Sequence, residues 1–124
     1  MSRKTGRMAA ALLGAALTVG IGARAQAAPG YVVNEIEVTD ETVFQTYRTQ
    51  QSALIRSFDG RFLARGSTTD TIAGAPAASR VVIYVFDSME KLRAWRNAPE
   101  QTALNAIRDR SSKFRSFAVE GEPQ

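Results

Sequence analysis

Hydrophobic and polar residues alternate along Tyr31–Val38 as they do in a β-strand that is buried on one face. The apolar face of this strand contains one amide and consists of Val32, Asn34, Ile36 and Val38. Asp40 follows and is typical of a residue that caps a helix N-terminus. The apolar spacing then predicts a helix over Glu41–Phe58, ended by Asp59-Gly60, with Gln51 on its apolar stripe.

The middle of the chain predicts two strands separated by a loop. Arg61–Ser67 alternates, which places Phe62, Ala64 and Gly66 on one face and Arg61, Leu63 and Arg65 on the other. Thr68–Ile72 is a candidate extension of this strand, and Ala73–Ser79 contains glycine and proline and predicts a loop. Arg80–Phe86 is a nearly continuous run of β-branched and aromatic residues, the strongest strand signal in the chain.

The last third predicts two helical segments and a strand. Asp87-Ser88 caps a helix to about Asn97, and Glu90 is placed for a capping box with Asp87. Pro99 opens a second helical segment, and Phe114–Val119 is the final strand. The order β-α-β-β-α-β predicts a ferredoxin-like α+β fold, in which helices cover one face of a four-stranded sheet.

The other face of that sheet is predicted to be too apolar to stay in water. It would carry Tyr31, Val33, Leu63, Tyr84 or its neighbours, and Phe117. A second copy laid against it would cover it, so we expect a homodimer in the form of a dimeric α/β barrel. Such pairing is a common route to stability for a small domain that has no disulfide.

Residues 1–27 have the pattern of a cleavable signal peptide. Arg3, Lys4 and Arg7 precede a short apolar run, and Ala25-Gln26-Ala27 is a small-residue cleavage pattern, with Ala23-Arg24-Ala25 as a second choice. The run is shorter than the roughly 20 apolar residues that a membrane helix needs. We therefore expect a periplasmic or secreted protein with no membrane partner after cleavage. Residues 28–124 would form a single domain with its core at 31–121.

Cleavage also changes the charge. Four of the 16 basic residues and none of the 12 acidic residues lie before residue 28, so 12 of each remain and the net charge of +4 falls to zero. Since proteins that bind nucleic acid carry an excess of clustered positive charge, no nucleic-acid partner is expected.

The chain contains no cysteine and no histidine. Zinc sites, histidine-ligated haem and Ser-His-Asp triads therefore cannot be built from its residues. We expect no metal and no cofactor.

Several segments together resemble one known family. They are Thr39-Asp40-Glu41 with Phe44 and Tyr47, then Asp59-Gly60-Arg61-Phe62-Leu63-Ala64-Arg65-Gly66, then Phe86, Ser88, Trp95, Pro99-Glu100 and Ile107-Arg108. The pattern over about Tyr31–Gly121 resembles the domain-of-unknown-function 1330 family. The resemblance implies the dimeric α/β-barrel superfamily, which includes cofactor-free monooxygenases, lactone isomerases and haem enzymes. Asp59, Val85 and Gln101 stand where the family often has Gly, Glu and Tyr.

Arg65 is the first candidate for a binding site. Gly66 follows it in the strand and would let a ligand approach closely, and an arginine in a concave site binds carboxylate or enolate oxygens through two hydrogen bonds. The alternative is an ion pair with Asp40 or another acid, or a place at the dimer interface. Asp40 itself is either a helix cap or a general base that orients Arg65.

The other candidates each have a structural alternative. Tyr47 and Trp95 would line an aromatic pocket or belong to the core. Asn34 and Gln51 are amides on apolar faces, and buried amides need hydrogen-bond partners, which a cavity with water or a polar ligand would supply. Arg108 points to the same region or lies on the surface.

These residues favour a pocket for a small organic anion in an exported homodimer. As an enzyme, the protein would fit cofactor-free oxygenase or isomerase chemistry. The alternatives are a non-catalytic binding module and a purely structural dimer.

Overall fold

The computed structural model describes residues 27–124, so the predicted signal peptide lies outside the described residues except for Ala27. The elements, in chain order, are β1 (Gly30–Val38), α1 (Glu41–Ser57), β2 (Arg61–Gly66), β3 (Arg80–Phe86), α2 (Met89–Arg96), α3 (Gln101–Ser111) and β4 (Ser112–Glu120). None of the helices in this part of the chain is long and apolar enough to span a membrane.

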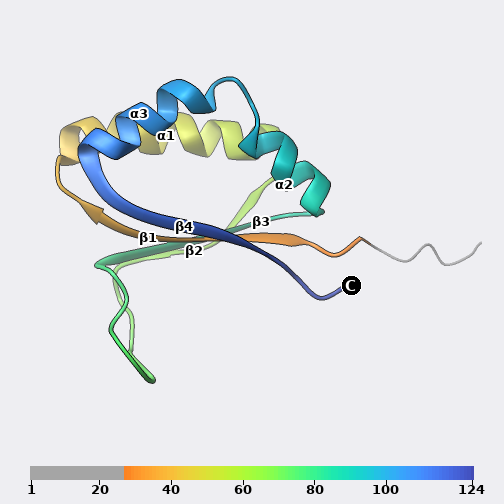
Figure 1. Ribbon diagram of the computed structural model, residues 1–124, viewed down its shortest axis with the longest axis horizontal. Helices are drawn as coiled ribbons and strands as arrows, with labels where there is room; N and C mark the ends of the chain where they lie inside the picture. The colour runs from red at the N-terminus through yellow and green to blue at the C-terminus, as the bar shows by residue number, and fades with distance from the viewer. Residues whose placement is uncertain (1–26) are drawn as a thin grey trace, which may run out of the picture.

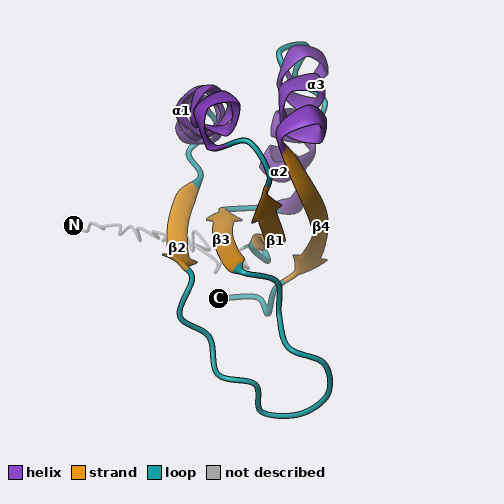
Figure 2. Ribbon diagram, turned by 90° about the vertical axis from the view of Figure 1, so that its left-hand side faces the viewer, coloured by secondary structure: helices purple, strands orange, loops and turns teal. Residues whose placement is uncertain are grey.

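The four strands form one antiparallel sheet in the order β2-β3-β1-β4. All three helices lie on the same face of the sheet, as Figure 1 shows. Seen end-on in Figure 2, α1 lies above β2 and β3, and α3 lies above β1 and β4. This is the predicted ferredoxin-like arrangement, with the second helical region divided into α2 and α3.

The core lies between the sheet and the helices. One buried cluster, under α2, consists of Val32, Ile55, Tyr84, Phe86, Leu92 and Trp95. A second, under α1 and α3, consists of Ile36, Phe44, Tyr47 and Leu104. Tyr84 pairs with Val32 in the sheet and therefore faces the helices. The prediction for the outer face named Tyr84 or its neighbours, and the neighbours of Tyr84 are the residues that face outward.

Helix α1 begins at the predicted residue and ends one residue before the predicted end, for identifiable reasons. Asp40 caps it, because its Oδ1 accepts a hydrogen bond of 3.1 Å from the backbone N–H of Val43. At the other end Asp59 adopts a left-handed φ of 63°. Glycine takes that conformation without strain, which gives a physical reason for the glycine that the resembled family often has at this position. Asp59 forms a 3.0 Å ion pair with Lys91.

Strand β2 differs from its predicted alternation. Phe62 pairs with Tyr84 and Ala64 pairs with Ile83, so Leu63 is an extra residue in a β-bulge. Arg65 then pairs with Val82 and shares its face of the sheet, which is the helix-covered face. The prediction that Arg65 lies opposite Phe62 was wrong, because a bulge of one residue reverses the alternation after it.

Two local predictions were also wrong. Residues 67–79 form a loop that leaves the sheet on the side away from the helices, so Thr68–Ile72 does not extend β2 (Figure 2). The N-cap of α2 is Ser88, whose hydroxyl accepts a 3.1 Å hydrogen bond from the Lys91 N–H. Asp87, expected in a capping box, instead pairs with Arg61 at 3.0 Å.

Candidate functional site

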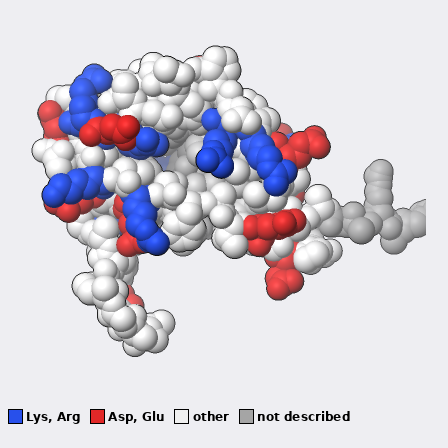
Figure 3. Space-filling view, viewed as in Figure 1, with Lys and Arg blue, Asp and Glu red and all other residues white. Residues whose placement is uncertain are grey.

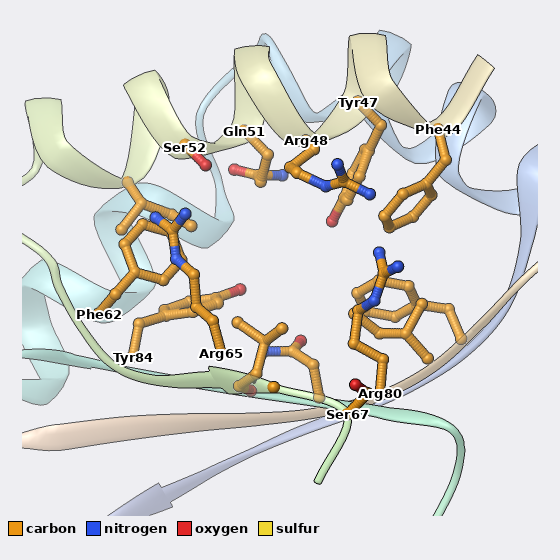
Figure 4. A pocket seen from close by; sticks show the side chains of 16 residues that line it. Phe44, Tyr47, Arg48, Gln51, Ser52, Phe62, Arg65, Ser67, Arg80 and Tyr84 are labelled. Carbon is orange, nitrogen blue, oxygen red and sulfur yellow. Dashed lines mark hydrogen bonds between the residues drawn. The ribbon is translucent and has the colours of Figure 1, made fainter. Parts of the chain in front are cut away.

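A cavity of about 280 Å³ lies between α1 and the β2-β3 side of the sheet. Its apolar lining comes from both layers and consists of Ile36, Phe44, Ile55, Phe62, Val82 and Phe114. Its polar lining consists of Asn34, Tyr47, Arg48, Gln51, Ser52, Arg65, Ser67, Arg80 and Tyr84. None of the described residues that line it is acidic. Figure 4 shows these side chains converging from α1 above and from the strands below.

Arg65 reaches this cavity because of the bulge at Leu63. Its guanidinium group stacks on the Phe62 ring at 3.5 Å from the ring centroid, and Arg56 lies 5.4 Å from the same ring. Arg65 forms no ion pair with any acid among residues 27–124. Burial lowers the pKa of Arg65, and the positive charges of Arg56 and Arg48 lower it further. This guanidinium group therefore lacks a counter-charge among the residues that the structure describes.

Two further arginines, Arg48 from α1 and Arg80 from β3, stand at the same opening (Figure 4). They share one carboxylate, since Glu41 lies 2.9 Å from Arg48 and 3.6 Å from Arg80. The hydrogen bond from Arg48 is the main cause of the lowered pKa of Glu41, and the charge of Arg80 acts in the same direction. Two of the three guanidinium groups thus share a single carboxylate while Arg65 has none, and the opening is positively charged.

The interior wall of the cavity is polar and almost fully buried. Asn34 is 1% exposed; its Nδ2 donates to the Val82 carbonyl at 2.9 Å, and its Oδ1 accepts from the Ser116 hydroxyl at 2.7 Å. Tyr47 and Tyr84 are 7% and 4% exposed. Burial raises the pKa of both phenols, most strongly that of Tyr84, so both stay protonated at neutral pH.

Gln51 belongs to a closed hydrogen-bond network. Its Nε2 donates to Gln101 Oε1 at 2.8 Å, and its Oε1 accepts from the Trp95 indole at 2.9 Å. Gln101 Nε2 in turn donates to the Trp95 carbonyl at 3.0 Å. The protein itself thus supplies the partners that we expected a ligand or water to supply. The network joins α1 to α2 and α3 and holds the interior wall in place.

A second cavity of about 310 Å³ lies between α2 and α3 and the β1-β4 side of the sheet. Trp95, Arg96, Gln101, Asn105 and Arg108 line it. In Figure 3 the surface is hollowed here, with basic side chains around the hollow. Arg108 binds Asp109 at 2.8 Å and Asn105 at 3.1 Å, so its charge is already paired. The two cavities share Asn34, Tyr47, Gln51, Tyr84 and Phe114 as a common wall.

The predicted site residues do not all line one cavity. Asn34, Tyr47 and Gln51 line both cavities, Arg65 lines the first, and Trp95 and Arg108 line the second. Asp40 lines neither of these two cavities and caps α1, and no ion pair joins it to Arg65. Within residues 27–124 no group of three or more acidic side chains is placed to hold a metal ion.

Sequence reasoning missed Arg48, Arg80, Tyr84 and Gln101. The spacing of residues in the sequence contained a signal for three of these four. Arg48 is four residues after Phe44 on the helix, and Arg80 and Tyr84 lie two residues either side of the inward-facing Val82. The only sequence signal at Gln101 was that the resembled family often has tyrosine at this position.

Solved structures share this fold at low sequence identity. A protein of unknown function from Rhodopseudomonas palustris has a TM-score of 0.62 and 11% identity, covering 79% of this chain and 85% of its own. SnoaB, a cofactor-independent oxygenase from Streptomyces nogalater, has a TM-score of 0.57 and 15% identity, covering 79% and 97%. An Arabidopsis thaliana protein has a TM-score of 0.56 and 12% identity, covering 82% and 93%. At such identities the likeness shows the fold alone.

No curated protein matches the sequence. A family model does, over residues 29–122, which is nearly all of the described chain. The Gly60–Gly66 segment and Trp95, on which the predicted resemblance partly rests, both lie within this match. The chain therefore belongs to the family described as domain of unknown function DUF1330.

Proposed function

We propose that the protein binds a small organic anion with an apolar body in the cavity under α1, and that Arg65 is its main anionic contact. The observation that carries this proposal is the position of the Arg65 guanidinium group. It lines the cavity, stacks on Phe62 and has no acid partner among the described residues. A guanidinium group of this kind is suited to a carboxylate, which it binds through two parallel hydrogen bonds.

The rest of the cavity supports an apolar body for the ligand. Phe44, Phe62 and Phe114 supply aromatic surface beside the charged opening. Arg48 and Arg80 add positive charge that Glu41 offsets only in part. Ligand pockets commonly combine a mostly apolar lining with a few converging polar groups. An aryl carboxylate has this combination of charge and apolar surface.

The proposal is tested with phenylacetate and its neutral analogue phenylacetamide, titrated by calorimetry. We expect phenylacetate to bind at least about tenfold more tightly, because charge-assisted hydrogen bonds to arginine are roughly twice as strong as neutral ones. Arg65→Met removes the guanidinium group and keeps an apolar stem to pack on Phe62, so it should abolish the preference. Arg61→Met is the matched control, since Arg61 lies on the same strand, pairs with Asp87 and is absent from the cavity lining.

The proposal fails if wild-type protein does not bind phenylacetate, or if Arg65→Met and Arg61→Met weaken it equally. The same titration separates a binding module from an enzyme. A ligand recovered unchanged, with no oxygen consumed, favours the non-catalytic alternative. A ligand consumed in the absence of added cofactor favours cofactor-free oxygenase or isomerase chemistry, for which the shared fold of SnoaB is the support.

We also propose that a second copy of the chain covers the outer face of the sheet. Leu63, Phe117 and Val119 are 54%, 43% and 50% exposed there. Beyond this apolar region, Glu35 and Arg115 form an ion pair on neighbouring strands of the same face. A face with an apolar region and charges of both signs can complement itself across a two-fold axis.

The proposed location, periplasmic or secreted, rests on the sequence of residues 1–27 alone.

A further inference from the structure

Two buried phenols in the wall of the cavity lack a hydrogen-bond acceptor. Tyr47 descends from α1 and Tyr84 rises from β3, and Figure 4 shows both hydroxyl groups directed into the space beside Arg48, Arg65 and Arg80. Asn34 lies within hydrogen-bonding reach of the Tyr84 phenol, and Gln51 and Arg108 lie within reach of the Tyr47 phenol, and each lowers the pKa as a donor to the phenol oxygen does. No hydrogen bond in which either hydroxyl group is the donor is formed among the described residues, although Tyr84 is only 4% exposed. Buried polar groups in native proteins are nearly always paired, so an unpaired one suggests a missing partner.

Each amide oxygen in the same wall already accepts one hydrogen bond from the protein. Asn34 Oδ1 accepts from the Ser116 hydroxyl at 2.7 Å, and Gln51 Oε1 accepts from the Trp95 indole at 2.9 Å. The basic groups at the opening are donors and cannot accept. The two phenols therefore offer O–H groups to a ligand, and what they lack is an acceptor placed to receive them.

Both phenols keep their protons. Burial raises the pKa of Tyr84, and the neighbouring Tyr47 raises it further, while Asn34 acts weakly in the opposite direction. Burial likewise raises the pKa of Tyr47, against smaller opposing effects from Gln51 and Arg108. A phenol whose pKa lies above its usual value is a hydrogen-bond donor throughout the neutral range.

We propose that Tyr47 and Tyr84 donate hydrogen bonds to a carbonyl oxygen adjacent to the anionic group of the ligand, so that the cavity selects 2-oxo acids over plain carboxylic acids. This rests on the proposed function, because Arg65 must first hold the carboxylate. The oxo group then takes the place of the missing acceptor in the wall. A site built to hydrogen-bond one ligand atom discriminates against an analogue that lacks it, because its own polar groups are then left unpaired.

The test uses two ligands that differ at one carbon. Benzoylformate has a carbonyl where phenylacetate has a methylene, and both have a phenyl ring and a carboxylate. In wild-type protein we expect benzoylformate to bind about tenfold more tightly, the worth of one or two added hydrogen bonds. Tyr84→Phe and Tyr47→Phe should each reduce this ratio, and the double variant should bring it to about one.

Tyr31→Phe is the control, because Tyr31 is a β1 residue that lines neither of the two cavities, and it should leave the ratio unchanged. Tyr84→Phe should also leave the Tm of the empty protein close to that of wild type, since the removed hydroxyl group donates to no acceptor in the empty protein. Equal affinity of wild-type protein for both ligands would overturn the inference and leave the proposed function standing. An equal loss of affinity for both ligands in Tyr84→Phe would also overturn the inference. If neither ligand binds, the proposed function itself is wrong.

Discussion

Two glycines at the ends of β2 differ in what surrounds them. A Cβ atom on Gly60 would lie 2.6 Å from Ile55 Cγ2, 2.8 Å from a Phe86 ring carbon and 2.9 Å from the Ile55 carbonyl. A Cβ atom on Gly66 would meet nothing nearer than the Thr68 nitrogen at 3.9 Å. Protein atoms therefore crowd Gly60, where the end of α1 packs on β3, whereas Gly66 is open and lines the cavity beside Arg65.

This difference predicts opposite outcomes for the same substitution. Gly60→Ala should lower the free energy of unfolding by about 2–3 kcal/mol, because the added carbon overpacks against backbone and a buried ring. Gly66→Ala should change it by no more than about 0.5 kcal/mol. Urea denaturation measures both. Equal stability of the two variants would show that the turn after α1 relaxes to admit the methyl group.

At the scale of elements, the three helices depend on a few buried amides. Gln51→Leu leaves the Trp95 indole and Gln101 Oε1 without their partners. Each unpaired buried group costs about 1–3 kcal/mol, so we expect a loss of about 2–4 kcal/mol in the free energy of unfolding. Gln50→Leu is the control, since Gln50 is the exposed neighbour on the same helix. A loss in Gln51→Leu no greater than in the control would mean that the network adds nothing to stability.

The elements themselves were largely predictable, and the face of one strand was not. Helix α1 shows a clear period of 3.6 residues, strand β3 is a nearly continuous run of β-branched and aromatic residues, and their observed bounds agree with the prediction to within a residue. The direction of Arg65 depends on the bulge at Leu63, which alternation cannot reveal. Gln51 and Gln101 lie 50 residues apart, so their pairing could not be read from local pattern. For Asp40, local pattern was sufficient because a cap is a local interaction.

For the whole molecule, the proposed homodimer has a direct test. Phe117→Glu places a charge in the middle of the exposed apolar face and should convert a dimer to a monomer in light scattering. Ala106→Glu, at an exposed position of α3 on the helical side, should leave the dimer intact. A wild-type mass equal to one chain would exclude the shared barrel. Retention of the dimer in Phe117→Glu would place the interface elsewhere.

The bulge in β2 has a further consequence for changes in chain length. Because Leu63 is one residue more than the ladder with β3 requires, removing it would restore regular alternation from Phe62 through Ala64 to Arg65. In that shorter strand Phe62 and Arg65 would still lie on the same side, two positions apart. A deletion at this point would thus preserve the direction of Arg65, whereas straightening the strand at its present length would turn the arginine outward. Relatives with one residue fewer here could keep the same guanidinium group in the cavity.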